Sequence, residues 1–312
     1  MNPAYRSSSK DWPELDFRQG SDTIASLHLW TQVVGKIRLM LTPWTNHSWH
    51  VPLYITARGM HTSPIPYRDR SFEIYFDFID HRLMIETTDG SQAQLLLEAR
   101  SVADFYDEVM ATLKTVGIDI NIYTMPSEIP DAIPFEQDTV HQAYDPDYAN
   151  RFWRALVQVD RVFKEFRARF IGKCSPVHFF WGSFDLAVTR FSGREAPPHP
   201  GGVPNFPDWV AREAYSHEVS SAGFWPGGAG VEYAAFYAYA YPAPDGFSEY
   251  GIQPDAAAWS KELGEFLLPY DDVRRAESPD EVLLDFLQSS YEAAADLARW
   301  DRAALERDLG KP

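Results

Sequence analysis

The chain has 312 residues, 45% of them hydrophobic, so it is long enough and apolar enough to bury a full core. Its formal net charge of −17 argues against nucleic acid and anionic membranes as partners, because both need a positive protein surface. The single cysteine, Cys174, excludes an intrachain disulfide framework. The sequence also has no signal-like segment and no apolar run near the roughly 20 residues of a spanning helix. We therefore expect a cytoplasmic protein.

The first half of the chain predicts a helix, a group of strands and a second helix. Apolar residues recur at three- and four-residue spacing from Leu27 to Leu41, which indicates a buried helix face that ends before Pro43. Alternating apolar and polar residues separated by turn signals predict an antiparallel meander over residues 49–56, 71–80, 82–88 and 95–97. Ser101 caps a predicted helix that Gly117 closes, and residues 118–123 are predicted as a last strand.

The segment between Met125 and Pro146 is rich in proline and acidic residues. Proline cannot donate to a strand or helix ladder, so this composition favours an extended connector. We therefore expect an N-terminal half over residues 1–125, a connector over 126–145 and a C-terminal half over 146–312.

The second half repeats the order of the first. Asp145 and Pro146 supply an N-cap and a first-turn proline, and the apolar stripe that follows predicts a long helix reaching Phe170. Strands are predicted over residues 177–191, 214–221, 232–241 and 265–268. Ser278 and Pro279 open a last helix.

These elements predict an α+β fold of two similar halves, each an antiparallel sheet with flanking helices. The apolar stripes of the first helix in each half share one spacing: Trp30, Val34, Ile37 and Leu41 in one, and Phe152, Leu156, Val159 and Phe163 in the other. Such a match favours an internal duplication. The alternative is a chance likeness between the alternating elements of a large α+β protein.

The densest polar and aromatic segment, residues 173–185, lies in the second half. His178 and Asp185 beside the large ring of Trp181 would suit a general acid or base in a water-poor pocket. On a regular strand the two point to opposite faces, so they need a bulge, which Gly182 would supply. The alternative is a core histidine that is hydrogen-bonded to backbone.

His217 and Glu218 form a second candidate pair, although a regular strand would also point them to opposite faces. A metal site is a further interpretation: His50, His178 and His217 would come from separate strands, with Glu218 or Asp185 as a carboxylate ligand. No local spacing such as HExxH supports it, and ordinary hydrogen-bonded histidines are the alternative.

Two other features suit ligand binding. The net basic stretch 151–173, which ends at Lys173, would suit an anion, whereas the alternative is pairing with the net acidic stretch 277–308. Tyr237 and Tyr239 share one strand face and would line a pocket for a polar or aromatic small molecule. The alternative is that they cover a surface while alanines on the other face pack beneath a helix.

Three segments resemble an uncharacterised bacterial family of domain-of-unknown-function proteins: IGKCSPVHFFWGSFDLAVTRFSGR (Ile171 to Arg194), REAYSHEVSSAGFWPGG (Arg212 to Gly228) and FDFIDHRL (Phe76 to Leu83). The likeness extends over nearly the whole chain. The resemblance implies a bacterial, cytoplasmic protein of this length, and it carries no activity and no catalytic residue over to this sequence.

The sequence thus predicts a small-molecule enzyme with its site in the C-terminal half and His50 reaching in from the first half. The expected catalytic residues are His178, His217, Glu218 and Asp185. The expected ligand-binding residues are Lys173, Trp181, Tyr237, Tyr239 and His50. A divalent metal on His178, His217 and His50 stays open as a cofactor. The alternative function is a non-catalytic small-molecule-binding or protein-assembly module.

Overall fold

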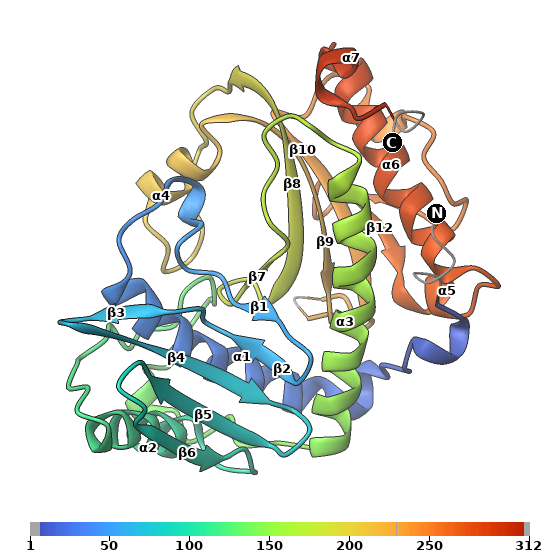
Figure 1. The fold of residues 1–312 in the computed structure, drawn as a ribbon. Helices are drawn as coiled ribbons and strands as arrows, with labels where there is room; N and C mark the ends of the chain where they lie inside the picture. Colours follow the sequence, from blue (N-terminus) through green and yellow to red (C-terminus); the bar gives the residue numbers. More distant parts are fainter. Residues whose placement is uncertain (1–6, 229, 309–312) are drawn as a thin grey trace.

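Two antiparallel sheets, one from each half of the chain, form the framework of the molecule (Figure 1). The computed structural model describes residues 7–228 and 230–308. Over these residues each sheet has six strands, and helices pack on both, so the predicted α+β fold with two sheet-containing halves is confirmed. None of the helices in this described part combines the length and hydrophobicity needed to cross a bilayer.

The first half holds helices α1 (Phe17–Leu41) and α2 (Val102–Thr115). Its strands are β1 (Tyr54–Ile55), β2 (Gly59–His61), β3 (Ile65–Tyr67), β4 (Arg70–Asp77), β5 (Arg82–Thr87) and β6 (Gln92–Leu96). They pair in the order β1-β2-β4-β5-β6, with β3 also on β4. β4, β5 and β6 follow the predicted meander, whereas β2 and β3 were not predicted and the strand expected over residues 49–56 is reduced to Tyr54–Ile55. Alternation sets the buried face: Phe72, Ile74 and Phe76 of β4 enter the core.

One predicted strand of the first half is wrong. Residues 118–123 belong to no strand. Ile118 and Ile122 are nevertheless buried, so their alternation reflects the packing of an unpaired segment on the core. Sequence alternation reports burial, and pairing needs a free sheet edge beside the segment as well.

The second half begins with α3 (Pro146–Ala168), which is capped by Asp145 as predicted. Its other helices are α4 (Asp208–Ala214), α5 (Tyr270–Arg274), α6 (Pro279–Leu297) and α7 (Arg302–Leu305). Its strands are β7 (His178–Phe180), β8 (Asp185–Glu195), β9 (His217–Trp225), β10 (Ala235–Tyr241), β11 (Ala258–Ser260) and β12 (Glu265–Pro269), paired in the order β11-β12-β10-β9-β8-β7.

Two strand predictions of this half need correction. The expected strand over residues 177–191 is a hairpin, in which β7 and β8 are joined by a tight turn over residues 181–184. Phe184 has a φ of 59°, a left-handed conformation that reverses the chain there. The expected strand over residues 214–221 instead starts at His217, because α4 continues to Ala214.

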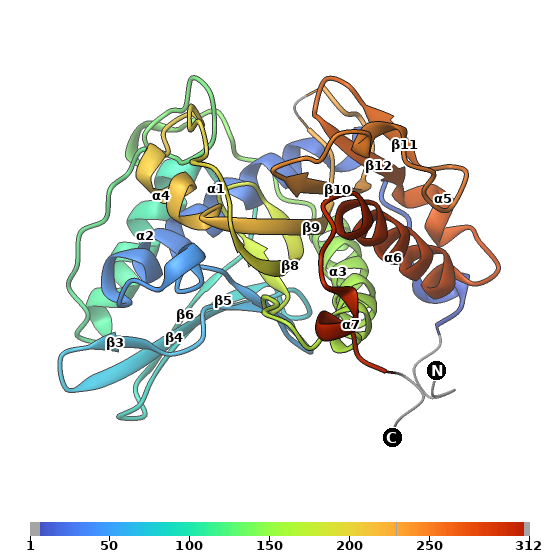
Figure 2. The ribbon, with the colours of Figure 1, turned by 90° about the horizontal axis from the view of Figure 1, so that it is seen from above.

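The two faces of the second sheet have different neighbours. Side chains such as Leu186, Phe224 and Phe236 are fully buried on the face that packs against α3 and α6. Ala187, Gly223 and Tyr237 form one cross-strand row on the other face. Figure 2 shows α3 and α6 on one side of this sheet and α4 on the other. The second face is therefore the one that is free to line a site.

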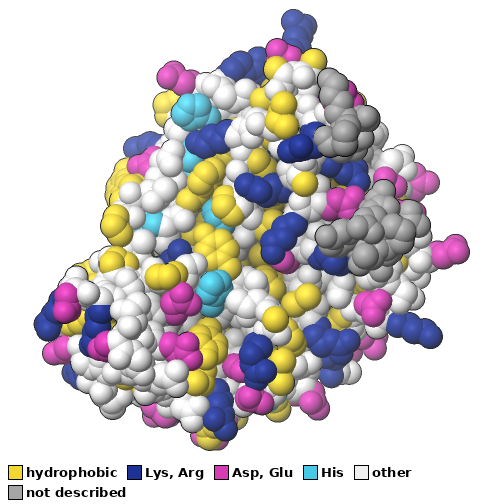
Figure 3. Space-filling view, in the orientation of Figure 1, with side chains coloured by type: hydrophobic (Ala, Val, Ile, Leu, Met, Phe, Trp, Pro, Cys, Tyr) yellow, Lys and Arg dark blue, Asp and Glu magenta, His cyan; other side chains and the backbone are white. Residues whose placement is uncertain are grey.

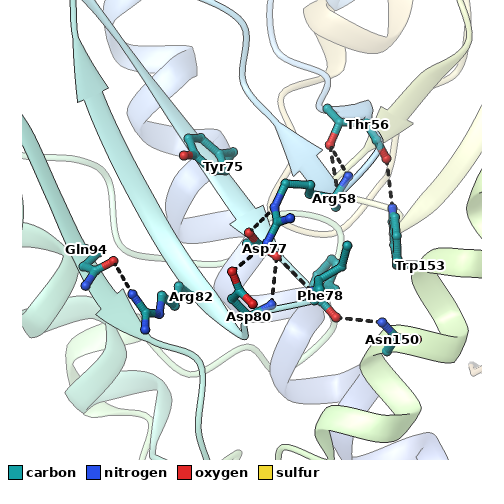
Figure 4. A network of polar contacts seen from close by, with 12 residues as sticks. Thr56, Arg58, Tyr75, Asp77, Phe78, Asp80, Arg82, Gln94, Asn150 and Trp153 are labelled. Carbon is teal, nitrogen blue, oxygen red and sulfur yellow. Dashed lines mark hydrogen bonds and ion pairs between the residues drawn. The ribbon is translucent and has the colours of Figure 1, made fainter. Parts of the chain in front are cut away.

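The halves share one hydrophobic core, and α3 is hydrogen-bonded to the first half (Figure 4). Asn150 Nδ2 donates to the Phe78 carbonyl at 2.8 Å, and Trp153 Nε1 donates to the Thr56 carbonyl at 3.0 Å. Nearby, Arg58 makes ion pairs with Asp77 and Asp80 at the edge of the first sheet. The internal duplication stays a prediction.

An ion pair between the basic stretch 151–173 and the acidic stretch 277–308 forms where α3 meets α6. The Arg161 guanidinium donates to both carboxylate oxygens of Asp280, at 2.7 and 2.6 Å. Burial alone would raise the pKa of Asp280, but the hydrogen bonds from Arg161 and Ser7 outweigh burial and lower it. This pair ties the outer helices together.

Candidate functional site

A cavity of about 440 Å³ lies on the second face of the second sheet, and we call it the central cavity. β8, β9 and β10 form its floor, and α4 with the loop that precedes it forms one wall. The turn over residues 46–49 and the connector residues Ser127 and Glu128 close the remaining sides. Its lining is rich in aromatic rings: Trp44, Trp49, Phe180, Trp181, Phe191, Phe206, Trp209, Tyr215, Tyr237 and Tyr239.

Asp185, the first residue of β8, is one of two carboxyls in this lining. The hydroxyls of Ser183 and Tyr237 both donate hydrogen bonds to it. The Tyr237 ring lies across Gly223, where a Cβ would come within 2.3 Å of the ring, so the close approach requires glycine. Burial raises the pKa of Asp185, and the two hydroxyl hydrogen bonds oppose this rise without cancelling it.

Glu128 is the second carboxyl, and it comes from the connector. Its backbone has a φ of 64°, an unusual conformation for a glutamate, and its N–H donates to the Pro204 carbonyl at 2.9 Å. A Cβ on Gly182 would lie 2.1 Å from Glu128 Oε1, so the carboxyl occupies the space that Gly182 leaves open. Burial, and then the charge of Asp185, raise the pKa of Glu128 to about 7, although Lys36 acts in the opposite direction.

Polar side chains along one side of α1 hold the connector at Glu128 and the β7–β8 turn at Gly182. Gln32 Nε2 donates to the Ser127 carbonyl at 2.9 Å, and the Ser127 N–H donates back to Gln32 Oε1 at 2.8 Å. One turn later, Lys36 Nζ donates to Ser127 Oγ at 3.0 Å. One turn earlier, His28 Nε2 donates to the Gly182 carbonyl at 2.8 Å. The helix therefore fixes both sides of the contact between Glu128 and Gly182.

Hydroxyl groups cover the floor of the central cavity. Tyr215 and Tyr239 share a hydrogen bond of 2.7 Å between their hydroxyls, and Thr189 and Ser221 share one of 2.8 Å. Burial raises the pKa of both tyrosines, so both keep their protons. A pair of tyrosine hydroxyls uses one proton in its mutual bond and keeps the other to donate.

Comparison with known proteins adds a family to this geometry. A model of a family of unknown function (DUF5996) matches residues 12–307. The chain belongs to that family. No curated protein and no solved structure matches it. The predicted resemblance to a domain-of-unknown-function family is confirmed, and the roles of residues in this DUF5996 protein have to come from its own structure.

Four of the predicted site residues line the central cavity: Trp181, Asp185, Tyr237 and Tyr239. Trp181 is fixed by its Nε1, which donates to the Val51 carbonyl at 2.9 Å. The rings of Tyr237 and Tyr239 stack at 6.1 Å between centroids. Their common face follows from the alternation of β10, as the sequence indicates.

His178 is not in the cavity lining. It is fully buried in β7 between the rings of Trp49 and Tyr54, with centroid distances of 5.8 and 5.6 Å. No described residue forms a hydrogen bond with either of its ring nitrogens. Burial lowers its pKa to about 3, which keeps the ring neutral. Figure 3 shows hydrophobic side chains gathered over β1 and β7 on this face.

Three more predicted residues also lie outside the lining. Glu218 forms an ion pair of 2.7 Å with Arg194. His217 Nδ1 and the Ser216 hydroxyl share a hydrogen bond of 3.0 Å. His50 Nδ1 accepts from the Thr45 N–H at 3.2 Å. Within residues 7–228 and 230–308, no three His, Cys, Asp or Glu side chains are arranged to hold a metal ion, so the three-histidine set is not assembled.

Lys173 is not in the cavity lining, but it is hydrogen-bonded to His47, a lining residue that the sequence analysis missed. His47 Nδ1 donates to the Ala214 carbonyl at 2.8 Å, so Nε2 is left to accept from Lys173 Nζ at 2.6 Å. The two bonds fix the tautomer of His47 and join α4 to the turn over residues 46–49.

Glu128, Gln32 and Lys36 were also missed. Gln32 and Lys36 had a signal in the sequence: they are two polar residues, four apart, inside an apolar helix stripe, which places both on one buried face. Glu128 had none, because it lies in a proline-rich acidic segment where a glutamate is unremarkable in composition.

Proposed function

We propose that this DUF5996 protein is an enzyme that transfers a proton to or from a small molecule bound in the central cavity. The observation that carries the proposal is the meeting of two carboxyls from distant segments, Glu128 and Asp185, in one aromatic cavity. The volume of about 440 Å³ is in the ordinary range for a small-molecule site.

The surroundings of the two carboxyls support different roles. No described residue donates a hydrogen bond to the Glu128 carboxyl, and its pKa of about 7 is well matched to proton transfer near neutral pH. Glu128 is therefore the general base. Asp185 already accepts from Ser183 and Tyr237, so it orients Tyr237 and stays a fixed acceptor.

The tyrosine pair supplies the complementary group. Tyr215 and Tyr239 keep one hydroxyl proton beyond their mutual hydrogen bond, and this proton would be donated to a substrate oxygen that gains negative charge. The surrounding rings exclude water, which strengthens both the base and the donor. The proposed reaction thus needs only residues of the cavity lining.

Turnover of metabolites tests this proposal. Purified protein is incubated with a cell metabolite extract, and consumed and formed compounds are identified by mass spectrometry. We expect changes with the wild type and with Glu136→Gln, a matched exposed control in the same connector. The same changes should be at least a hundredfold slower with Glu128→Gln. Equal turnover by Glu128→Gln contradicts the assignment of the base; no turnover by any form indicates a binding protein instead.

A further inference from the structure

We infer that the central cavity takes an organic ammonium ion, with the positive nitrogen at Glu128 and Asp185 and the rest of the molecule against the aromatic rings. This inference names the substrate class of the site and rests on the proposed function. It is carried by the charges of the lining and by the arrangement of the tryptophans.

The charge of the lining is one-sided. Among the described lining residues there are two carboxyls, Glu128 and Asp185, and no lysine or arginine. Glu265 of β12 lies near Asp185. Burial, and then the charge of Asp185, raise the pKa of Glu265 to about 7. A buried carboxyl without a cation is costly, and a bound cation supplies the missing partner.

The nearest protein cation does not fill this role. Lys36 Nζ is hydrogen-bonded to Ser127 Oγ, and it forms no ion pair with the Glu128 carboxylate within the described residues. Lys36 acts on Glu128 only through its field, which lowers the Glu128 pKa against the larger effect of burial. The Glu128 carboxyl therefore remains open toward the cavity for a ligand nitrogen.

Two tryptophans at the cavity are unusually exposed. Trp44 is 41% exposed and Trp209 is 54% exposed, although both line the cavity. Their ring centroids are 4.7 Å apart, and Trp44 Nε1 donates to Glu213 Oε1 at 2.8 Å, which orients the pair. Tryptophan faces attract organic cations most strongly among the aromatic residues, and solvent-exposed pairs of this kind mark binding surfaces.

Three other rings of the lining are already engaged by lysines. Lys173 Nζ lies over the rings of Trp49 and Phe191, at 5.3 and 4.7 Å from their centroids, and Lys36 Nζ lies 5.8 Å from that of Trp181. The rings that remain are the Trp44 and Trp209 pair, the tyrosines of β10, and Phe180, Phe206 and Tyr215. They supply the apolar surface for the rest of the ligand.

Two other ligand classes fit less well. A phosphate or carboxylate would meet two carboxyls and no cation in the lining. A bare divalent metal ion would need a set of oxygen or nitrogen ligands, and the described residues contain no such group of three. An organic ammonium ion matches both the charge and the rings.

Three probes of one skeleton separate charge from shape: phenethylamine as the cation, 2-phenylethanol as the neutral analogue and phenylacetate as the anion. Binding is measured at pH 8 by titration calorimetry. We expect phenethylamine to bind at least tenfold more tightly than 2-phenylethanol, and phenylacetate to bind weakest. Equal or tighter binding of the neutral or anionic probe, or no binding of phenethylamine at millimolar concentration, overturns the inference.

Variants locate the effect. Glu128→Gln should weaken phenethylamine at least tenfold and leave 2-phenylethanol unchanged, and Asp185→Asn provides a second, independent removal of charge. Glu136→Gln, exposed in the same connector, should change neither. Unchanged phenethylamine binding in both cavity variants overturns the inference. Failure here is distinguishable from failure of the proposed function, because turnover by Glu128→Gln is measured whatever the charge of the substrate.

Discussion

At the scale of single residues, Glu128 and Gly182 depend on each other. Glu128 keeps a left-handed backbone, which disfavours most side chains, and its carboxyl fills the space beside Gly182. Strain of this kind persists where the surrounding structure fixes it, and here Gln32, Lys36 and the Pro204 carbonyl do so through Ser127 and the Glu128 N–H.

Gly182→Ala should therefore damage the site more than the fold. The new Cβ would lie 2.1 Å from Glu128 Oε1, and because that atom is the end of a flexible side chain, the carboxyl can move away. We expect a loss of about 1 kcal/mol in the free energy of unfolding and at least a tenfold loss of turnover. Gly251→Ala, where the added Cβ meets nothing within 4 Å, is the control. Full activity of Gly182→Ala contradicts the role of Glu128.

Glu128→Gln should stabilise the protein at high pH. The Glu128 pKa is about 7 in the folded protein against 4.5 ordinarily, so between these values the folded state holds a proton that the unfolded chain has released. Wild-type stability thus falls as pH rises through this window. Glutamine does not ionise, so the variant should gain on the order of 2–3 kcal/mol above pH 7 and nothing near pH 4.

Urea unfolding at pH 4 and pH 8 measures this difference. Glu136→Gln is again the reference, because its carboxyl is exposed in the same connector. Identical unfolding free energies for wild type and Glu128→Gln at pH 8 would show that the Glu128 carboxyl has its ordinary pKa in the folded protein.

The individual site residues were predictable where strand alternation or local composition marks them. Tyr237 and Tyr239 follow from the period of β10, and Asp185 follows from its place in a polar and aromatic segment. His178 lies outside the cavity lining, which the sequence did not indicate because a histidine in a strand gives no sign of which face is the core. Glu128 depends on a long-range meeting with Gly182, which no local pattern encodes.

At the scale of elements, α1 combines two tasks. Its apolar residues, including Trp30 and Ile37, belong to the shared core, while Gln32 and Lys36 bond the connector residue Ser127. Hydrophobic periodicity predicts the first task, since it reports burial. The second escaped prediction because a buried lysine becomes tolerable only through partners supplied by another segment.

Lys36→Met should shift the titration of the site without dismantling it. Lys36 lowers the pKa of Glu128, so removing its charge should raise that pKa above its present value of about 7. We expect the pH at which turnover is half-maximal to rise by about one pH unit in Lys36→Met. Gln32→Met removes a neutral partner of Ser127, so it should lower turnover and leave that pH nearly unchanged. Equal pH profiles for Lys36→Met and the wild type contradict this positioning role.

At the scale of the whole molecule, the site depends on all three parts of the chain. The first half supplies Lys36 and His47, the connector supplies Glu128, and the second half supplies Asp185 and the tyrosine floor. The sequence places the expected activity in the second half with only His50 reaching in from the first, because only packing brings α1 and the connector beside the hairpin of β7 and β8. A cavity built in this way requires the two halves to keep a fixed relation.

The contacts of α3 predict that the halves unfold as one unit. Trp153 joins α3 to the first half by donating to the Thr56 carbonyl, and its ring lies in the shared core. Trp153→Phe keeps most of the ring and removes the hydrogen bond, leaving the Thr56 carbonyl without that donor. We expect a loss of about 1–2 kcal/mol in the free energy of unfolding and a single transition, in which far-UV and near-UV circular dichroism shift together.

Trp209→Phe makes the same exchange at a half-exposed position and should cost less than 0.5 kcal/mol, a small loss of the size usual at surfaces. Two separate transitions in the wild type would mean that each half folds alone. The central cavity would then form only when the halves dock, and turnover would disappear before the second transition begins.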